Sequence, residues 1–323
     1  MPAYEEVDWI EWAVEGIIDF VDELVIAEGY RGPRWHFGDG HSKDGTIDII
    51  NKLAKKYDKI TLAESQPRRD FLRGNAATHN YVLKISKCIK EADWYMICDS
   101  DEFYTDRQKD VIWKTLETAD KDAFAVKDRM FFNNFTCYVD QSLARFFRVT
   151  PGMFFKPAQF PFYKDGKPYY DYSVNPPSLL LENDPMFHYS FVRKPCREIQ
   201  RRIMEYCAVQ HYQSVFSWID NVYLQWNEEN AEKIYEINRK CFGGKGGIFM
   251  NADEEILRLR IYNGDHPQIL DNHPYRHIED IRKIHWPEKA AHKYVLLRHH
   301  ITHYSLRFCK FIKSILQKAK IFL

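Results

Sequence analysis

Three acidic side chains follow directly after a short apolar segment in the first third of the chain. Residues 94–98 (Trp-Tyr-Met-Ile-Cys) indicate a buried strand, because they are apolar and rich in aromatic and β-branched types, and Asp99, Asp101 and Glu102 come next. Carboxylates this close repel one another unless positive charge neutralises them, and a hard divalent cation with oxygen ligands does so. The sequence therefore predicts a metal site at the end of this strand, with helix capping or plain solvent exposure as the alternatives.

A histidine lies in a second short apolar segment, residues 186–192, which is predicted to be a strand. Imidazole is a common metal ligand, so this residue, His188, is a candidate third ligand beside Asp99 and Asp101. The alternative is a histidine that packs and hydrogen-bonds within the core.

Residues 39–46 (Asp-Gly-His-Ser-Lys-Asp-Gly-Thr) form a glycine-rich, acidic segment just before a helical pattern. Glycines let backbone amides approach a ligand, and a helix N-terminus favours a phosphate. The segment lacks the Gly-Lys-Ser/Thr ending of a Walker loop, and it is not Gly-x-Gly-x-x-Gly. We expect either a phosphate-binding element or an Asp-Gly turn. Arg73 is a candidate for pairing with a phosphate, or else an ordinary surface arginine.

The elements that must position these residues alternate between strand and helix patterns over the first hundred residues. Strand-like segments end at Glu28, Glu64 and Asp99, and the carboxyl ends of parallel strands share one edge of a sheet. From Pro195 onwards helical patterns dominate. We predict an α/β fold with a Rossmann-like, mostly parallel sheet flanked by helices in residues 1–192, and a mainly helical region in residues 193–323 for acceptor binding or packing.

The composition narrows the class of protein. Lys+Arg and Asp+Glu both number 46, so no basic excess points to nucleic acid as a partner. No apolar run is long enough to span a bilayer, and no signal peptide is recognisable. The 7 cysteines are widely spaced without a Cys-x-x-Cys pair, which favours reduced thiols over a disulfide framework or a zinc site. We therefore expect a cytoplasmic protein.

Several segments together resemble the family 2 glycosyltransferases of the GT-A fold. Residues 1–6 (Met-Pro-Ala-Tyr-Glu-Glu) are similar to that family's Pro-Ala-Tyr-Asn-Glu-Glu opening, and residues 39–46 are similar to its Asp-Gly-Gly-Ser-Thr-Asp-Gly-Thr element. Residues 93–102 resemble its strand with the Asp-x-Asp motif. Residues 145–148 (Arg-Phe-Phe-Arg) and 262–267 (Tyr-Asn-Gly-Asp-His-Pro) resemble segments of some members. The resemblance covers residues 1–192 well and the remainder only weakly.

The resemblance implies a GT-A-like domain that binds a nucleotide-sugar, with uridine as the expected base, and a Mn²⁺ or Mg²⁺ ion. By position, the base pocket would be lined by Pro2, Ala3 and Tyr4, and Asp39 or Glu28 would hold the base or the ribose. The chain departs from the family here. It starts inside the motif that normally follows a first strand, and residues 30–38 are an insertion, so Glu28 and Asp39 cannot both take the family's single acidic position.

The resemblance also assigns roles around the Asp-x-Asp motif. Asp99 would contact the ribose and the metal, with Ser100 beside it in the nucleotide site, and Asp101 would bind the metal that bridges the diphosphate. Transfer with inversion at the anomeric carbon needs a carboxylate that takes the proton of the acceptor hydroxyl. The candidates for this base are Glu182 and Asp184, which lie shortly before His188.

These expectations amount to a metal-dependent glycosyltransferase that moves a sugar to a glycan, a lipid-linked acceptor or a protein. The alternatives are a nucleotidyltransferase, which would release pyrophosphate, and a non-catalytic sugar-binding protein on a degenerate transferase fold. Residues 308–323 alternate lysines with Phe, Ile and Leu. This segment is expected either to contact an anionic membrane surface or to pack on the protein as an amphipathic helix.

Overall fold

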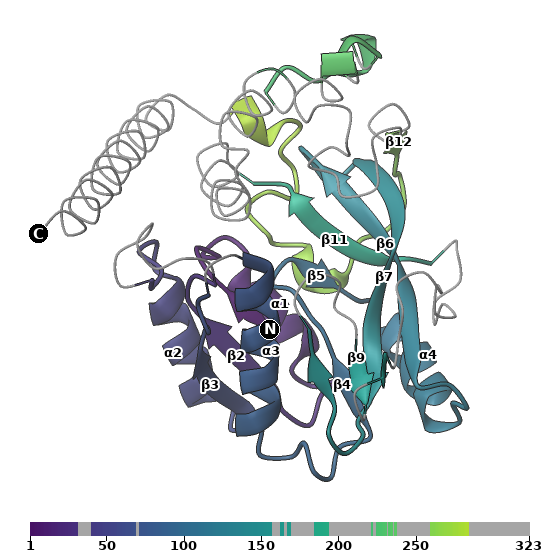
Figure 1. The fold of residues 1–323 in the computed structure, drawn as a ribbon. Helices are drawn as coiled ribbons and strands as arrows, with labels where there is room; N and C mark the ends of the chain where they lie inside the picture. The colour runs from purple at the N-terminus through teal and green to yellow at the C-terminus, as the bar shows by residue number, and fades with distance from the viewer. Residues whose placement is uncertain are drawn as a thin grey trace, which may run out of the picture.

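The computed structural model describes residues 1–31, 40–68, 71–156, 162–164, 167–168, 184–193, 221, 224–230, 232–234, 236–237 and 259–283. These residues form a mixed α/β structure with two main sheets. Figure 1 shows the first sheet with its helices below and to the left of the second, larger one.

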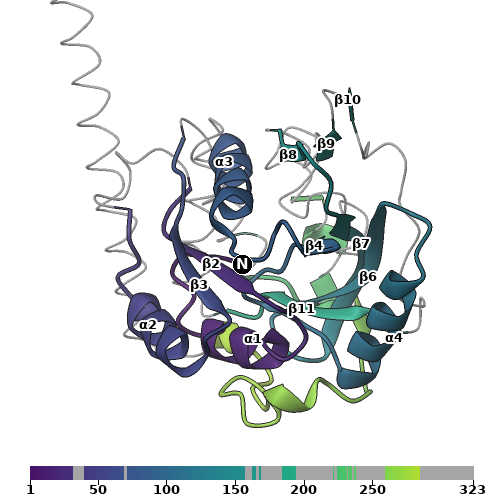
Figure 2. The ribbon, with the colours of Figure 1, turned by 90° about the horizontal axis from the view of Figure 1, so that it is seen from below.

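The first sheet is parallel and carries helices on both faces. Its strands are β1 (Pro2–Ala3), β2 (Leu24–Glu28) and β3 (Ile60–Glu64), in the order β1-β2-β3. Figure 2 shows α1 (Ile10–Ile17) and α2 (Thr46–Lys56) on one face and α3 (Phe71–Ile85) on the other. Glu28 and Glu64 are register partners at the carboxyl ends of β2 and β3, so the predicted acidic rim is confirmed for these two residues.

Apolar residues at helical spacing bury the inner face of α1 against this sheet. Ile10, Ala13, Val14 and Ile17 follow the i, i+3, i+4, i+7 pattern, and all four are buried. β2 is buried along its whole length, as expected of a strand covered on both faces. The burial of these apolar faces, and not local propensity, therefore holds this layer in place.

The second sheet is mixed and mostly antiparallel. It has the order β12-β7-β6-β11-β5, and β4 pairs with β7. Its strands are β4 (Trp94–Met96), β5 (Glu102–Phe103), β6 (Ala123–Phe132), β7 (Cys137–Arg148), β11 (Met186–Phe191) and β12 (Arg260–Ile261). Among these pairs only β11 and β6 run parallel.

The prediction of a mostly parallel sheet is therefore right for β1 to β3 and wrong for the strand that leads to Asp99. β4 lies antiparallel to β7, with Tyr95 opposite Phe147. The physical reason is the short connection between β6 and β7, residues 133–136. Such a short loop can join only antiparallel neighbours, and it brings the long strand β7 alongside β4.

The remaining described elements lie around these two sheets. α4 (Asp106–Glu117) begins with a capping box in which Thr105 and Gln108 exchange hydrogen bonds. A small antiparallel sheet contains β8 (Phe154–Phe155), β9 (Phe162–Lys164) and β10 (Lys167–Pro168). Three short 3₁₀ helices are η4 (Glu228–Asn230), η6 (Gln268–Leu270) and η7 (Ile281–Lys283).

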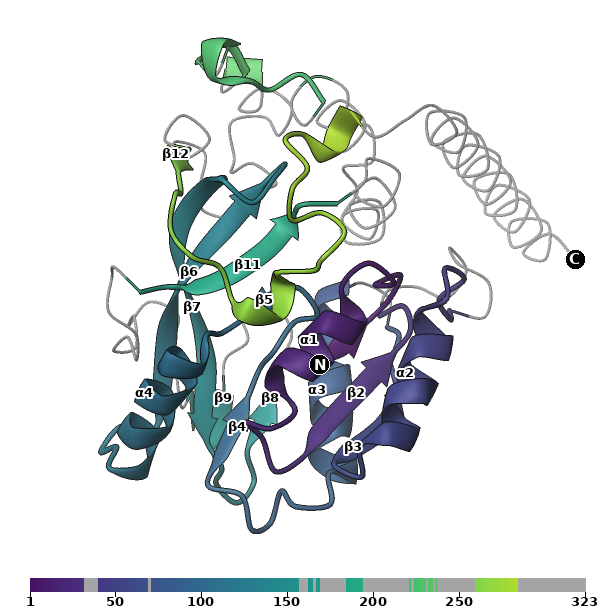
Figure 3. The ribbon, with the colours of Figure 1, turned by 180° about the vertical axis from the view of Figure 1, so that it is seen from behind.

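Residues 259–283 pack against the N-terminal elements. Leu270, Tyr275 and Ile281 belong to the same apolar core as α1 and β11, and the His273 ring stacks on Trp9 with 4.1 Å between centroids. Figure 3 shows this segment crossing beside β11 and β5. The domain division near residue 192 stays a prediction, because most of residues 194–258 and all of residues 284–323 lie outside the described residues, including the segment 308–323.

Within the part of the chain that the structure describes, no helix has the length and apolar character needed to cross a bilayer. The cellular location stays a prediction.

Candidate functional site

The residues from Asp99 to Glu102, called the acidic turn below, lead from β4 into β5, and Glu102 is the first residue of β5. Ser100, Asp101 and Glu102 are buried, whereas the side chain of Asp99 is 39% exposed. The turn is held from β11, because Tyr189 N–H donates to the carbonyl of Asp101 (2.9 Å). The predicted acidic cluster thus exists, and each of its three carboxylates faces a cationic side chain.

Arg145 on β7 neutralises two of the three acids. Its Nη2 lies 3.2 Å from Asp99 Oδ2 and also pairs with Glu102 Oε1. Burial raises the pKa of Asp99, but the Arg145 guanidinium counteracts it, and the net pKa is lowered. For the fully buried Glu102 the burial effect is stronger than the pull of Arg145, and its pKa is raised to about 7.

Asp101 is paired with an arginine that comes from the far end of β11. Arg193 Nη2 lies 2.6 Å from Asp101 Oδ2, and its Nη1 lies 2.6 Å from Glu6 Oε2. The Arg193 side chain is only 2% exposed. One guanidinium therefore joins the Asp-x-Asp turn to the opening segment of the chain.

His188 lies between two carboxylates. Its Nε2 is 3.3 Å from Asp101 Oδ1, and its Nδ1 is 3.1 Å from Oδ2 of Asp128 on β6. Burial lowers the pKa of His188, but Asp128 and then Asp101 together outweigh burial, so the pKa is raised well above its ordinary value. Oδ1 of Asp128 is buried and has no hydrogen-bond partner among the described residues.

Two of the three predicted metal ligands, Asp101 and His188, lie side by side, and their role as ligands stays a prediction. Adjacent ligands stand about 3 Å apart when each metal–ligand bond is about 2.1 Å, and Asp101 Oδ1 and His188 Nε2 are 3.3 Å apart. A carboxylate on the second imidazole nitrogen, here Asp128, is the support that metal-binding histidines usually have. Because the raised pKa keeps His188 protonated in the absence of a metal, Mn²⁺ or Mg²⁺ would bind Nε2 in exchange for its proton.

The third predicted ligand, Asp99, is turned to Arg145. Over the described ranges, no group of three or more His, Cys, Asp or Glu side chains is gathered closely enough to hold a metal ion. A cation at Asp101 and His188 would therefore take its remaining ligands from Asp99 after a side-chain rotation, from water or from substrate oxygens.

The glycine-rich element is organised by Glu28 at the end of β2. Glu28 accepts a hydrogen bond from the backbone N–H of Ser42 (2.8 Å), and its other oxygen lies 2.7 Å from His41 Nδ1. Gly29 and Gly40 both have positive φ and bring these two chain segments together. Glu28, predicted to hold the base or the ribose, is thus fixed at this rim, while Asp39 lies outside the described residues.

The opening segment connects this element to the acidic turn. Glu5, at φ 57, accepts from Lys43 N–H (2.8 Å), and its own N–H donates to Ser42 Oγ (2.9 Å). The next residue, Glu6, pairs with Arg193. A left-handed conformation at a non-glycine residue costs free energy, and here it directs two successive carboxylates to two different partners.

The other predicted nucleotide-site residues lie as follows. Pro2 and Ala3 pair with Ala27 and Glu28 of β2, and the ring of Tyr4 lies 5.6 Å from that of Tyr30. Arg73 is exposed on the first turn of α3. These placements leave the predicted roles in binding untested.

Of the two carboxylates predicted as the general base, the structure describes only Asp184. Asp184 pairs with Arg107 (2.5 Å) and accepts from Gln108 Nε2 (2.9 Å), both at the start of α4. Glu182 lies outside the described residues. The structure therefore connects Asp184 to the start of α4.

No protein-family model matches the chain, and no curated protein matches it. The resemblance to glycosyltransferases consequently depends on the sequence motifs alone.

Sequence reasoning did not identify three residues of this site: Asp128, Arg193 and Glu6. The best signal for Asp128 is its position between Lys127 and Arg129 in a strand that is otherwise apolar, since buried charged residues are rare unless they are paired. Arg193 has no comparable local signal, because its two partners lie 92 and 187 residues away in the sequence.

Proposed function

We propose that this protein is a metal-dependent glycosyltransferase of the GT-A type, which transfers a sugar with inversion from a nucleotide-sugar to a hydroxyl acceptor. The observation that carries the proposal is the arrangement of Asp101, His188 and Asp128. Two of these side chains are spaced as metal ligands, and the third supports the imidazole from behind. The same turn is joined through Arg193 and Glu6 to the glycine-rich element around Glu28.

The proposed roles follow from charge and position. Asp101 and His188 would hold Mn²⁺ or Mg²⁺, which when bound supplies positive charge against the departing diphosphate. Asp99, the most exposed of the three acids, is the carboxylate best placed to accept from a ribose hydroxyl. Arg145 and Arg193 add fixed positive charge behind the turn, which favours an anionic ligand at this rim.

The proposed general base, which would take the proton of the acceptor hydroxyl, is Asp184. Arg107 Nη2 lies 2.5 Å from its Oδ2, and an inverting transfer needs a carboxylate for this proton transfer. Gln108 fixes the orientation of the same carboxylate. Removal of its charge in Asp184→Asn should lower kcat much more than it lowers donor affinity, because the base acts on the acceptor and not on the nucleotide.

The test of the proposal is ligand-induced stabilisation, measured as thermal unfolding with a panel of nucleoside diphosphates, each with and without Mn²⁺. A ligand at about a hundred times its Kd adds roughly 2.7 kcal/mol to stability. We expect one diphosphate, UDP first, to raise the melting temperature only when Mn²⁺ is present. The shift should be lost in Asp99→Asn and Asp101→Asn and kept in Asp140→Asn, whose carboxylate lies on β7 and pairs with Arg129 and Arg260.

Of the two site variants, Asp99→Asn should disturb the fold less, because the carboxylate that it removes is partly exposed. Asp101→Asn removes one of the two carboxylates that pair with the buried Arg193. A melting temperature that no diphosphate changes would contradict the proposal. So would a shift of equal size in the wild type and in both site variants.

A second candidate function is metal-independent sugar binding without transfer. It is favoured by one observation: Asp101 is already neutralised by His188 and Arg193. Under this alternative, glycan binding would be insensitive to chelator and to Asp99→Asn, and no nucleotide-sugar would be hydrolysed. The transferase proposal expects slow, Mn²⁺-dependent hydrolysis of the donor, measured as released nucleoside diphosphate.

A further inference from the structure

The imidazole of His41 lies at the carboxyl end of β2, bound to Glu28 but only partly covered. Its side chain is 40% exposed, whereas the side chain of Glu28, the last residue of β2, is 11% exposed. Ligands of open α/β sheets bind beyond the carboxyl ends of the strands. Of these two side chains, the imidazole is therefore the one that a ligand at this edge can contact.

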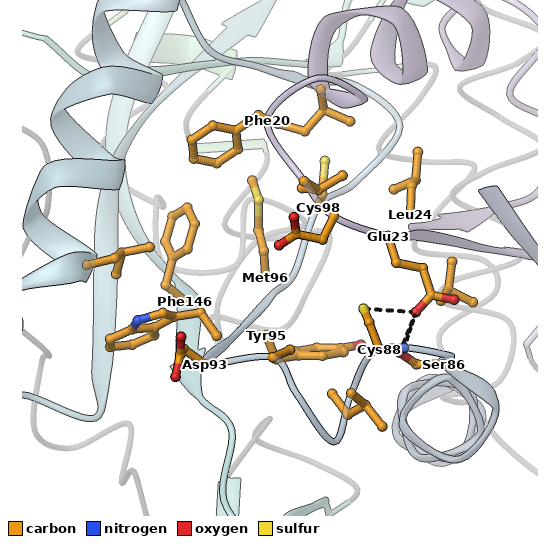
Figure 4. Close-up of a pocket in the computed structure, with 18 of the residues that line it drawn as sticks. Phe20, Glu23, Leu24, Ser86, Cys88, Asp93, Tyr95, Met96, Cys98 and Phe146 are labelled. Atoms are coloured by element: carbon orange, nitrogen blue, oxygen red, sulfur yellow. Dashed lines mark hydrogen bonds between the residues drawn. The ribbon is translucent and has the colours of Figure 1, made fainter. Parts of the chain in front are cut away.

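The start of β2 borders a cavity that is poorly suited to a nucleoside diphosphate. The cavity has a volume of about 340 Å³, and most of the side chains that line it are apolar. Figure 4 shows Phe20, Met96 and Phe146 close together on one side of it. Most of its charged side chains are acidic, namely Asp22, Glu23, Asp93 and Glu117. Because these charges repel a diphosphate, the carboxyl end of β2 is the better place for one.

Both carboxylate oxygens of Glu28 already take part in hydrogen bonds. Its Oε1 accepts from the backbone N–H of Ser42 (2.8 Å), and its Oε2 lies 2.7 Å from Nδ1 of His41. Ser42 is buried, so a ligand that displaced its N–H from Glu28 would leave a buried donor unpaired, which is costly. Glu28 is therefore better suited to hold the imidazole than to bind a ligand directly.

The chain on both sides of His41 is fixed by hydrogen bonds to other segments. The carbonyl of Gly40 accepts from Tyr30 N–H (2.7 Å), and Ser42 Oγ accepts from Glu5 N–H (2.9 Å). With its backbone held on either side and its Nδ1 held by Glu28, the imidazole has little freedom to lose when a ligand binds. A side chain that is preorganised in this way binds a ligand at a smaller entropic cost.

The hydrogen bond to Glu28 also fixes which ring nitrogen of His41 carries the proton. A carboxylate at neutral pH only accepts hydrogen bonds, so Nδ1 is the donor. In the neutral imidazole the second nitrogen, Nε2, then carries a lone pair and accepts. Nε2 therefore matches a ligand that donates an N–H, and it is mismatched to a ligand that offers another lone pair.

An aromatic side chain lies at the same edge of the sheet. Tyr4 follows Ala3, the register partner of Glu28, and is partly exposed. Its ring lies 5.6 Å from that of Tyr30, which is buried. Every base has a face that can stack on an aromatic ring, so Tyr4 can hold a base without distinguishing one from another. The distinction then has to come from a hydrogen bond of the kind that His41 can make.

We propose that His41 recognises the base of the nucleoside diphosphate, with Nε2 accepting a hydrogen bond from the ring N3–H of uracil. Cytosine has nearly the same shape, but its N3 carries a lone pair, which would face the lone pair of Nε2. Glu28 is a positioning residue that holds the imidazole in the accepting tautomer. This assignment rests on the proposed function and deepens it, because it gives His41 the contact with the base that was predicted for Glu28 or Asp39.

The test is the binding of UDP and CDP in the presence of Mn²⁺, measured by isothermal titration calorimetry. We expect the wild type to bind UDP about tenfold more tightly than CDP. In Glu28→Gln the side-chain amide can donate to Nδ1 of His41 while its oxygen still accepts from Ser42 N–H. The imidazole proton then moves to Nε2, and the preference should reverse in favour of CDP.

His41→Asn is a second, independent variant. Asparagine places an N–H donor close to the position of Nδ1 but has no counterpart of Nε2. UDP binding should weaken by about tenfold, to near the affinity for CDP. The matched control is Glu64→Gln, because Glu64 is the register partner of Glu28 at the end of β3. This control should keep the preference of the wild type for UDP.

A wild type that binds UDP no more tightly than CDP would overturn the role of His41 and leave the transferase proposal standing. So would an unchanged preference for UDP in Glu28→Gln and His41→Asn. A wild type that binds no nucleoside diphosphate would reject the transferase proposal, and the role of His41 with it. If Glu28→Gln does not fold or binds neither diphosphate, His41→Asn decides. Its equal affinity for UDP and CDP supports the role of His41, and a retained preference for UDP rejects it.

Discussion

Arg193 binds Asp101 through a buried ion pair, with Nη2 2.6 Å from Oδ2, while its second terminal nitrogen binds Glu6. Asp101 is also the residue for which the sequence predicts a metal. Its charge is thus shared between a fixed guanidinium on one oxygen and His188 on the other. A cation can join this arrangement on the His188 side without displacing Arg193.

This relationship predicts that Mn²⁺ restores part of the stability that the Arg193→Gln variant loses. Breaking a buried ion pair by removing one partner costs about 3–5 kcal/mol, because the other charge stays buried and uncompensated. Mn²⁺ bound beside Asp101 restores part of that charge balance. We expect urea unfolding to show a large loss of stability in metal-free buffer, and a larger gain from Mn²⁺ in the variant than in the wild type.

The matched control is Arg129→Gln, which removes another buried arginine from a carboxylate pair, this time with Asp140 on the neighbouring strand. It should be destabilised in the same way but gain no more from Mn²⁺ than the wild type does. Rescue of both variants to the same degree, or of neither, would contradict a cation at Asp101.

Asp128 is predicted to set the metal affinity without binding the metal. Its Oδ2 accepts from His188 Nδ1, which fixes the imidazole with Nε2 toward Asp101. Loss of such a supporting carboxylate typically lowers metal affinity by about 10–100-fold. Titration of Mn²⁺ followed by electron paramagnetic resonance should show this loss in Asp128→Asn. Asp140→Asn, which removes a carboxylate of β7 that pairs with Arg129, should bind Mn²⁺ as the wild type does.

The sequence predicted the parts of the site that are local and missed those that depend on long-range pairing. The apolar strand, the acids after it and the glycine-rich element before α2 can all be recognised within about ten residues. Arg193 cannot, because its role is fixed only when β11 lies beside β5 and the opening segment.

The wrong prediction of a parallel strand before Asp99 has a similar cause. Alternation of strands and helices continues up to β4, and nothing in residues 94–98 reveals the partner of that strand. The partner is β7, a strand about fifty residues later whose direction is set by the tight connection after β6.

The lowered pKa of Glu23 predicts that part of the free energy of unfolding is lost at acidic pH. Its hydrogen bonds lower its pKa to about 2 in the folded chain, against an ordinary value of 4.5. The unfolded chain therefore binds this proton at a higher pH than the folded one, and the contribution is present above pH 4.5 and lost as the pH falls towards 2. Thermal unfolding across this range should show a smaller decrease in Glu23→Gln than in the wild type.

The control for this prediction is Glu15→Gln, whose carboxylate pairs with Lys56 at the surface and has a pKa that is lowered less far. If both variants and the wild type lose stability in parallel between pH 4.5 and 2, the hydrogen bonds of Glu23 to the segment before β4 do not contribute as the structure implies.

Gly29 should tolerate no side chain, and its replacement should weaken nucleotide binding as well as stability. It has φ +114, and a Cβ there would lie 3.1 Å from the backbone oxygen of Gly40. That oxygen accepts from Tyr30 N–H (2.7 Å), so it cannot move away without breaking the bond. We expect Gly29→Ala to cost about 1–3 kcal/mol of stability through backbone strain, and to separate Glu28 from Ser42.

The control Gly152→Ala separates the backbone strain of a positive φ from the contact of the new Cβ with Gly40. Gly152 also has a positive φ, +76, but a Cβ there would meet nothing within 4 Å. Chemical unfolding should therefore show a loss in both variants that is larger for Gly29→Ala. Only Gly29→Ala should weaken the Mn²⁺-dependent stabilisation by the nucleoside diphosphate, because only Gly29 holds the Glu28 rim against the glycine-rich element. Equal diphosphate stabilisation in the two variants would mean that this rim does not form part of the nucleotide site.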